Sequence, residues 1–248
     1  MHYPDQSLRL LAGKLGLWLP LDSDHRAAIV ALPHVVRTLR AGEFIVREED
    51  RPRHSCLLLS GFAARHKLAG NGARQILALH IAGDLIDMHQ AMPTRADHNV
   101  QALSTASLAF VPLDAIRELT TQHPAVGEAM WFETLVEAAT LREWMLNIGR
   151  RDARTRTAHL LCEVAVRLRA AGLGERDQFV LPFTQEQMAD ALALTNVHVS
   201  RMLALLAAEG LIERHNRRLT ILDFARLTTV GDFDPRYLHL ERYGEVAG

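Results

Sequence analysis

The segment from Phe183 to Asp223, FTQEQMADALALTNVHVSRMLALLAAEGLIERHNRRLTILD, constrains the fold more than any other part of the chain. Thr184 followed by Gln187 is the signature of a capping box, so we expect a helix to begin there. Thr195 can cap a second helix, and Gly210 can end it. The segment therefore predicts a helix, a tight turn and a second helix.

The second helix has one apolar face, which should be buried, and an opposite face, which should be exposed. Its apolar residues recur at helical spacing and should face the core: Val199, Met202, Leu203 and Leu206. The opposite face is centred on three positions, with His198 and Ser200 beside them: Val197, Arg201 and Ala204. A face with one long forked cation among short side chains can enter the major groove of DNA.

A hairpin is expected directly after the second helix. Apolar residues alternate from Leu211 to Ile221 around a polar turn of His215, Asn216, Arg217 and Arg218. This pattern is typical of two short antiparallel strands, which would form a wing beside the helices.

These three features, TQEQMADALALT, then VHVSRMLALLAAEGLI, then the hairpin, resemble in their order the winged helix-turn-helix of the bacterial Crp/Fnr transcription regulators. The alternative for the segment is a plain helical hairpin without a role in DNA binding. The resemblance implies binding to double-stranded DNA, a homodimer, contact with RNA polymerase and a cytoplasmic location.

The same resemblance assigns DNA contacts to individual residues. Arg201 matches a base-reading position, where a guanidinium can bond guanine at O6 and N7; the alternative is a solvated arginine paired with Glu209. Ser200 also matches a position that reaches base edges. The family positions that contact the DNA backbone correspond here to Thr184, Gln185, Thr195, His215, Asn216 and Arg217.

One position departs from the family pattern. Val197 stands where well-known members have a glutamate that accepts a hydrogen bond from a base. Valine can only contact a thymine methyl group. We therefore expect an operator that differs from the familiar consensus, with His198 and Asn196 as candidates for replacement polar contacts.

The part of the chain before this segment reads as two further regions. Leucines at helical spacing within residues 5–32 predict one or two short helices ending at Pro33. Short apolar runs separated by glycines then predict strands of a β-sandwich or roll: Val35–Leu39, Phe44–Val46, Cys56–Ser60, Ala63–Leu68, Gln75–His80 and Leu108–Val111. The Asn71-Gly72 pair is a hairpin signal.

The strand region, with AGE near residue 42, LLLSG ending at Gly61 and AGDLID at residues 82–87, resembles the β-roll sensor domain of the same family. The predicted fold class is therefore α+β: an N-terminal β-roll of the cyclic-nucleotide-binding type with jelly-roll topology, a long dimerisation helix, and a C-terminal winged helix-turn-helix. The corresponding domains are residues 1–124, 125–148 and 149–248, the last including a C-terminal tail.

The longest helical pattern runs from Ala125 to Ile148 and is apolar on more than one side. One stripe contains Met130, Leu141, Trp144 and Ile148, and the other contains Phe132, Leu135, Val136 and Ala139. A helix with two apolar sides needs two partners. The resemblance implies that these are its own β-roll and the same helix of a second subunit; the alternative is a helix buried within a monomer.

A hinge is expected at Gly149–Asp152, with Asp152 as the cap of a helix over Ala153–Ala171. Four arginines cluster there and are candidates for the DNA backbone or RNA polymerase, with a solvated hinge as the alternative: Arg150, Arg151, Arg154 and Arg156. Asp223 should cap a last helix before a tail that shows no pattern beyond packing.

The residues of the expected effector pocket are His89, Arg95, Asp97 and His98. Cyclic-nucleotide-binding members carry Gly-Glu and an arginine with a small residue, where this chain has Asp87-Met88 and Ala96-Asp97. Both elements are missing, and Asp97 would repel a phosphate. Arg95 lies one position before the place of the family arginine, and it could bind a phosphate there only with a shifted backbone.

His89 coincides with a haem ligand of a resembling carbon-monoxide sensor, but no second axial ligand is evident. Neither cysteine lies before residue 56, so the N-terminal cysteine cluster of the iron-sulfur oxygen sensors is missing. No other metal site is indicated. The sequence therefore does not identify a cofactor or effector.

Composition excludes several classes of function. The formal net charge of −1 gives no general attraction to polyanions, so DNA binding must rest on local patches. Cys56 and Cys162 lack metal-type spacing and are expected to be buried thiols of a reducing compartment. The sequence contains no long apolar run, GxSxG, phosphate-binding glycine loop or HExxH, so neither a membrane span nor an enzyme is predicted.

The favoured function is a sequence-specific homodimeric transcription regulator that binds a near-palindromic operator under control of an unidentified signal at the β-roll. The alternative is a sensor module for haem or another small molecule, whose C-terminal part contacts protein rather than DNA. The operator and the direction of regulation cannot be read from the sequence.

Overall fold

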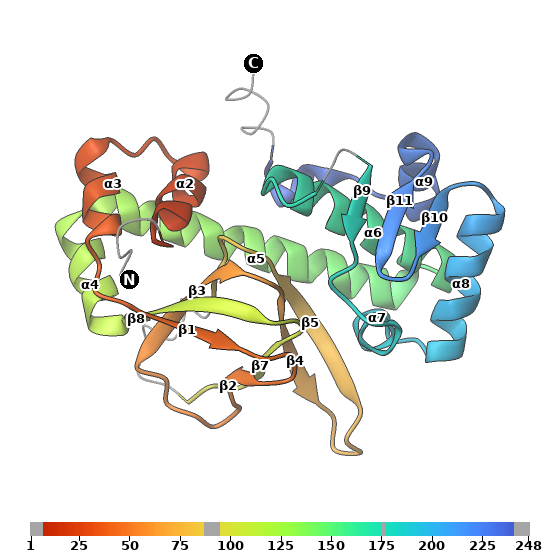
Figure 1. Cartoon of the computed structure of the whole chain (residues 1–248), viewed down its shortest axis with the longest axis horizontal. Helices are drawn as coiled ribbons and strands as arrows, with labels where there is room; N and C mark the ends of the chain where they lie inside the picture. The colour runs from red at the N-terminus through yellow and green to blue at the C-terminus, as the bar shows by residue number, and fades with distance from the viewer. Residues whose placement is uncertain (1–6, 87–94, 175–176, 241–248) are drawn as a thin grey trace. The chain divides into compact units, whose positions relative to one another are not determined.

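The computed structural model of the chain describes residues 7–86, 95–174 and 177–240. These residues form two compact units. The first contains residues up to Lys67 together with Ala78–Ala138, and the second contains Leu68–Leu77 together with residues from Ala139 onward. Helix α5 (Pro124–Arg150) contributes its first half to the first unit and its second half to the other (Figure 1).

Two four-stranded sheets, in orange to yellow-green in Figure 1, form the β-roll. Their orders are β1-β8-β3-β6 and β2-β7-β4-β5, and the strand pairs whose register is known are antiparallel. The strands are β1 (Val35–Leu39), β2 (Phe44–Val46), β3 (His54–Ser60), β4 (Ala63–Leu68), β5 (Arg74–His80), β6 (Leu85–Ile86), β7 (Asn99–Ala102) and β8 (Ala106–Pro112). The six predicted strands are confirmed, whereas β6 and β7 were not predicted.

The core of the roll contains side chains from both sheets. Leu58 and Leu108 come from one sheet, Ala63 and Val100 from the other, and all four are completely buried. The thiol of Cys56 lies in the same cluster, and Cys162 is buried elsewhere, so the prediction of two buried free thiols is confirmed. Burial raises the pKa of Cys162 to about 12.

The Asn71-Gly72 hairpin is confirmed, although the turn lies one residue earlier than the pair indicates. The amide of Gly72 donates to the carbonyl of Ala69 at 2.8 Å, which places Gly70 and Asn71 at the centre of the turn. Gly72 follows with a φ of +82°, a left-handed conformation that glycine adopts without strain. The side chain of Asn71 accepts from the amide of Ala73 and fixes the turn further.

The N-terminal region forms two helices, as predicted: α2 (Arg9–Trp18) and α3 (Ser23–Val30). Lys14 of α2 pairs with Asp84 after β5 and with Glu133 of α5, the latter at 2.7 Å. Burial disfavours the charged form of Lys14, but the two carboxylates raise its pKa above the ordinary value. The helix is thereby attached to the β-roll by a buried ion pair. Helix α4 (Leu113–Gln122) follows β8 and leads into α5.

The second unit is mainly helical. It contains α6 (Ala153–Ala170), α7 (Gln185–Leu192), α8 (Asn196–Ala208), α9 (Phe224–Gly231) and the short helix η2 (Pro235–Leu238). A small sheet of order β10-β11-β9 adds β9 (Gln178–Val180), β10 (Ile212–His215) and β11 (Arg218–Ile221) (Figure 1). The predicted helices and wing are confirmed; β9 was not predicted. The predicted α+β class with β-roll, long helix and winged helix-turn-helix is confirmed as a whole.

The expected hinge at Gly149–Asp152 is shorter than predicted. Helix α5 continues through Gly149 to Arg150, so only Arg151 and Asp152 separate it from α6. Asp152 caps α6 as expected, since its carboxylate accepts from the amide of Thr155 at 2.9 Å. This bond is the main cause that lowers the pKa of Asp152 below its usual value.

The exposed apolar residues of α5 do not coincide with either of the two predicted stripes. Met130, Ala139 and Trp144 are buried within the two units, because their side chains pack on neighbouring elements. The exposed apolar residues of the helix are Trp131, Leu135, Leu141, Met145 and Leu146. At about 100° per residue, Trp131, Leu135 and Met145 lie on one side of α5. We call these five residues the α5 row.

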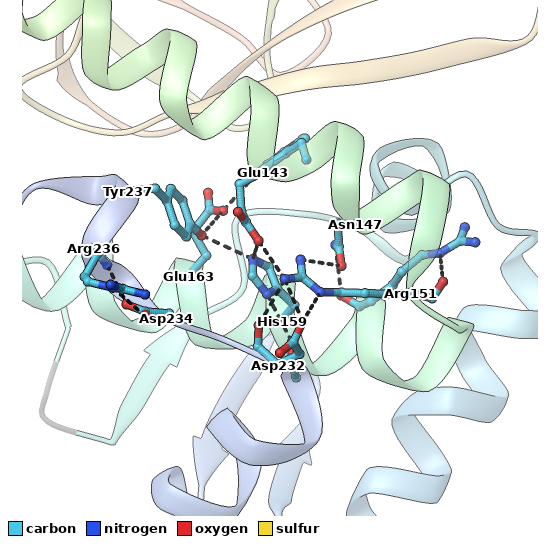
Figure 2. Close-up of polar contacts among 12 residues, drawn as sticks. Glu143, Asn147, Arg151, His159, Glu163, Asp232, Asp234, Arg236 and Tyr237 are labelled. Carbon is cyan, nitrogen blue, oxygen red and sulfur yellow. Dashed lines mark hydrogen bonds and ion pairs between the residues drawn. The ribbon is translucent and has the colours of Figure 1, made fainter.

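A buried polar network joins the end of α5 to α6 and η2 (Figure 2). His159 of α6 is fully buried, and its Nδ1 lies 3.1 Å from the carbonyl oxygen of Gly231. Burial lowers the pKa of His159, Arg151 acts in the same direction, and the carboxylates of Glu163 and Glu143 oppose the shift. The network therefore favours a neutral imidazole.

The free energy of unfolding is expected to fall as the pH drops below about 6.5, because the unfolded chain takes up a proton that buried His159 resists. The loss should be at most about 1.4 kcal/mol per pH unit. Urea titrations between about pH 7.5 and about pH 5.5 should show a shallower dependence in His159→Gln. His215→Gln, which removes an exposed wing histidine, is the matched control. Equal slopes in the wild type and His159→Gln would contradict this prediction.

Candidate nucleic-acid interface

Helix α7 begins with the predicted capping box. The hydroxyl of Thr184 accepts from the amide of Gln187 at 3.2 Å, and the Gln187 side chain accepts from the Thr184 amide at 2.8 Å. The helix buries Met188 and Leu192 and ends at Ala193, whose φ of +51° is left-handed. Thr184 is exposed and Gln185 is half-buried, so the start of α7 presents both to solvent.

Helix α8 is fixed at both ends by local bonds. The hydroxyl of Thr195 accepts from the amide of His198 at 3.2 Å, as predicted for the cap. At the other end, the amide of Leu211 donates to the carbonyl of Leu206, and the amide of Gly210 donates to the carbonyl of Ala207, each at 3.0 Å. This is a Schellman motif, and Gly210 has the left-handed φ of +71° that the motif requires. Val199, Leu203 and Leu206 are buried, and α7 meets α8 at 98°.

The outward face of α8 contains all the predicted base-reading residues. They are exposed: Asn196, Val197, His198, Ser200 and Arg201. Val197 is 66% exposed, an unusual environment for a large apolar side chain. We call these five residues the reading face.

Arg201 makes no hydrogen bond or ion pair within the described part of the chain. Its suspected partner Glu209 instead binds Arg154 of α6 through both carboxylate oxygens, at 3.1 and 2.5 Å. Hydrogen bonding to Arg154 lowers the pKa of Glu209. The alternative pairing of Arg201 with Glu209 is therefore not found, and the guanidinium of Arg201 faces solvent.

The wing presents His215 and Asn216 at its tip. His215 pairs with Arg218 across a two-residue turn, and Asn216 takes a left-handed φ of +55°. Both His215 and Asn216 are exposed. Arg217 differs from them, because its Nη2 donates to the carbonyls of Leu181 and Pro182 at 3.0 and 3.1 Å. Arg217 thus connects the wing to the segment between β9 and α7.

Most of the arginine cluster at the start of α6 is occupied by internal contacts. Arg154 binds Glu209, Arg151 binds Glu143 and Asp232, and Arg156 donates to the carbonyl of Leu192 at 2.9 Å. These contacts attach α7, α8 and α9 to α6. The side chains of Arg151 and Arg156 therefore hold the unit together, and Arg150 is exposed. Contact of the cluster with DNA or RNA polymerase stays a prediction.

Three of the predicted effector residues lie among the described residues, and each has a local partner. Arg95 is paired with Glu49 at 2.9 Å on the surface. Asp97 is exposed and lies 2.6 Å from Nδ1 of buried His98, a contact that lowers the pKa of Asp97. His89 lies outside the described residues. A hollow of about 250 Å³ elsewhere in the roll is lined by other residues, including Arg51, Arg53, His54 and Phe110.

Two further features concern metal ions and membranes. Among residues 7–86, 95–174 and 177–240, no group of at least three histidine, cysteine or acidic side chains is placed to hold a metal ion. Within the same ranges, no single helix is long and apolar enough to span a membrane. Helices α7 and α8 reach that length and hydropathy only when they are taken together across their bend.

The geometry described above defines a winged helix-turn-helix protein with an outward reading helix. Two family models agree: the Crp-like helix-turn-helix domain matches residues 155–230, and the cyclic nucleotide-binding domain matches residues 36–123. The transcriptional activator protein FnrL of Cereibacter sphaeroides is 31% identical over 210 residues, which cover 83% of this chain and 84% of FnrL. The chain belongs to the Crp/Fnr family and is a DNA-binding transcription regulator.

Further relatives agree with this assignment. The transcriptional activator protein Anr of Pseudomonas aeruginosa is 27% identical over 226 residues, or 91% of each chain. The solved structure of FixK2 from Bradyrhizobium japonicum has a TM-score of 0.73 at 24% identity and covers 80% of this chain and 98% of its own. The likeness to FixK2 supports the fold.

Proposed function

We propose that two copies of the chain form a homodimer that binds a near-palindromic operator through the reading face of each α8. The observation that carries the proposal is Arg201, an exposed guanidinium without an internal partner at the centre of that face. A guanidinium in this setting is free to bond guanine in the major groove. Two such helices about 34 Å apart would enter successive major grooves.

The backbone contacts of this proposal come from both sides of the reading face. Thr184, Gln185 and Thr195 lie at the starts of α7 and α8, where free amides and the helix dipole favour a phosphate. His215 and Asn216 form the exposed tip of the wing. These groups would supply affinity that is independent of base sequence. Arg217 can contribute to phosphate binding only through donors that its contacts with Leu181 and Pro182 leave available.

The α5 row supports the homodimer. Trp131 and Met145 are 66% and 67% exposed, values that are unusual for large apolar residues on a helix without a partner. In a two-fold contact the same row on a second copy would cover these apolar side chains. In this proposal, residues 1–124 form the sensor-like domain, residues 125–148 the dimerisation helix, and residues 149–248 the DNA-binding domain.

The regulator is proposed to respond to an unidentified signal at the β-roll and to contact RNA polymerase. Arg95 is engaged with Glu49, and Asp97 is negative, so the described residues favour an effector other than a cyclic nucleotide. The regulator is proposed to act in the cytoplasm, where promoters and RNA polymerase are found.

Val197 is expected to determine one base pair of each half-site. Val197→Glu adds a carboxylate that can accept a bond from the exocyclic amine of cytosine. The variant should shift the preference at that pair toward cytosine by about tenfold, since a good base contact contributes about 1–3 kcal/mol. Val197→Thr, which keeps the shape and one methyl group, should retain the wild-type preference. Sequencing of sites selected by the three proteins measures the effect, and identical motifs would contradict it.

Selection of bound sites from a random DNA pool tests the proposed function directly. The expected result is a two-fold symmetric motif with half-sites about one helical turn apart. Recovery of no motif at moderate salt would overturn the proposal. In that case the alternative, a haem- or small-molecule-binding sensor whose C-terminal unit contacts protein, would be preferred, and a Soret band after expression with added haem would support its haem form.

A further inference from the structure

The C-terminal segment after α9 takes part in the polar network that reaches α5. The hydroxyl of Tyr237 in η2 donates to Oε2 of Glu163 at 2.8 Å and lies 3.3 Å from Nε2 of His159. Phe233 packs its ring edge against His159 at a centroid distance of 5.1 Å. Figure 2 shows Tyr237, Glu163, Glu143 and His159 converging beneath α5, while Arg236 and Asp234 lie to one side.

Glu163 connects this segment to α5. Its carboxylate is 1% exposed and accepts from Trp144 Nε1 at 2.9 Å as well as from Tyr237. A buried carboxylate is stable only when its oxygens are bonded, and losing one charge-assisted bond costs more than losing a neutral one. The last turns of α5 and the tail are therefore held by the same buried anion.

A second connection runs through Arg151 at the break between α5 and α6. Its Nη2 lies 2.7 Å from Oε1 of Glu143, and its Nε donates to Oδ2 of Asp232 at 3.0 Å. The Nη2 group also donates to the backbone carbonyl of Asp232 at 3.1 Å. Arg151 thus links Glu143 of α5 to Asp232, the residue immediately after α9.

The break is the only non-helical stretch between α5 and α6 in this part of the chain, which the structure describes throughout. Helix α6 in turn contacts α8 directly, and Arg154 binds Glu209 at the end of α8. The angle at the break therefore determines how the reading face is oriented relative to the last turns of α5. Asp232 bonds Arg151 in the break and Tyr237 bonds Glu163 of α6, although both are far from the reading face in the sequence.

We propose that Tyr237 is a positioning residue for operator recognition: its hydroxyl orients the Glu163 carboxylate of α6, which accepts from Trp144 of α5, and so sets the half-site spacing that the dimer accepts. This inference rests on the proposed function, since half-site spacing has meaning only for a dimer on DNA. A fixed angle selects one spacing, because each reading face must meet its groove in register. A loosened angle should tolerate several spacings.

The test is Tyr237→Phe, which removes one hydroxyl and keeps the ring. Affinities are measured for the selected operator and for versions with one or two base pairs added or removed between the half-sites. The wild type should prefer one spacing, and Tyr237→Phe should reduce this preference about tenfold, as expected for the loss of one bond to a buried charge. Affinity for random duplex should stay the same.

Arg236→Ala is the matched control, because Arg236 lies on the same helical turn and its side chain pairs only with Asp234 among the described residues. It should keep the wild-type spacing preference. Asp232→Asn tests the second connection: asparagine tolerates the left-handed φ of +46° at this position but weakens the bond to Arg151. It should reduce the preference in the same direction as Tyr237→Phe.

A merely stabilising role for Tyr237 would lower the melting temperature and leave the spacing preference unchanged, and that result would overturn the inference. If Tyr237→Phe does not fold, a wild-type spacing preference in Asp232→Asn would also overturn it. A wild-type protein that selects no spaced motif would refute the proposed function instead, so the two failures are distinguishable.

Discussion

Arg201→Ala is expected to leave a folded protein that binds DNA but no longer prefers its selected operator over random duplex. Each subunit would lose a bidentate contact of about 1–3 kcal/mol, so the dimer should lose about 2–6 kcal/mol of discrimination. This corresponds to about thirtyfold or more in the ratio of dissociation constants. Folding should be unaffected because Arg201 is exposed and makes no hydrogen bond or ion pair among the described residues.

The measurement compares dissociation constants for operator and random duplex at one fixed salt concentration, since salt changes both. Arg201→Lys retains the charge but not the planar fork, and it should also lose discrimination. Arg214→Ala removes a wing cation whose side chain, within the described part of the chain, bonds only the carbonyl of Asn216, and it should weaken binding to both duplexes alike. An unchanged ratio in Arg201→Ala would exclude Arg201 from base reading.

Met145→Glu is expected to convert the dimer into monomers. The substitution would place two carboxylates in the proposed two-fold contact, where each must be desolvated beside a like charge. The dimer dissociation constant should rise on the order of a hundredfold or more. Affinity for the two-half-site operator should fall with it, because a monomer can occupy only one half-site.

Sedimentation velocity across a concentration series measures this change. Leu10→Glu is the matched control, because Leu10 of α2 is also an exposed large apolar residue, at 46%, and lies outside the α5 row. This control should sediment like the wild type. A Met145→Glu protein that remains dimeric would show that the interface lies elsewhere on the chain.

The winged segment was predictable because its signals are local. Thr184 and Gln187 lie within one turn, Thr195 bonds an amide three residues away, and Gly210 ends α8 through neighbouring amides. The reading face follows from the period of the helix. Its exposure was therefore expected as soon as the buried face was identified.

Features that depend on distant partners were not predictable in the same way. Strand β6 spans only Leu85–Ile86 and exists through pairing with β3, and β9 exists through pairing with β11. Arg151 looks like a solvated cation in the sequence, yet its partner Asp232 is 81 residues away. The bond of Tyr237 to Glu163 spans 74 residues and has no local pattern.

The exposed side of α5 differs from the predicted stripes for another reason. Trp131 and Met145 follow helical spacing, and this period was visible in the sequence. Trp144 was placed in one of two predicted stripes without a partner of its own, and its indole bonds buried Glu163 of α6, so this side of the helix faces inward. A helix with apolar residues on several sides cannot show by itself which side its own chain covers.

The residues that hold α8 in place and those of its reading face are separate sets. Thr195, Val199, Leu203, Leu206 and Gly210 fasten the helix, whereas the outward side chains of Val197, Ser200 and Arg201 support none of its packing. Substitutions on such a surface usually change stability by less than about 0.5 kcal/mol. A duplicated copy of this regulator could therefore acquire a new set of target promoters within a few substitutions, without first accumulating compensating changes in its fold.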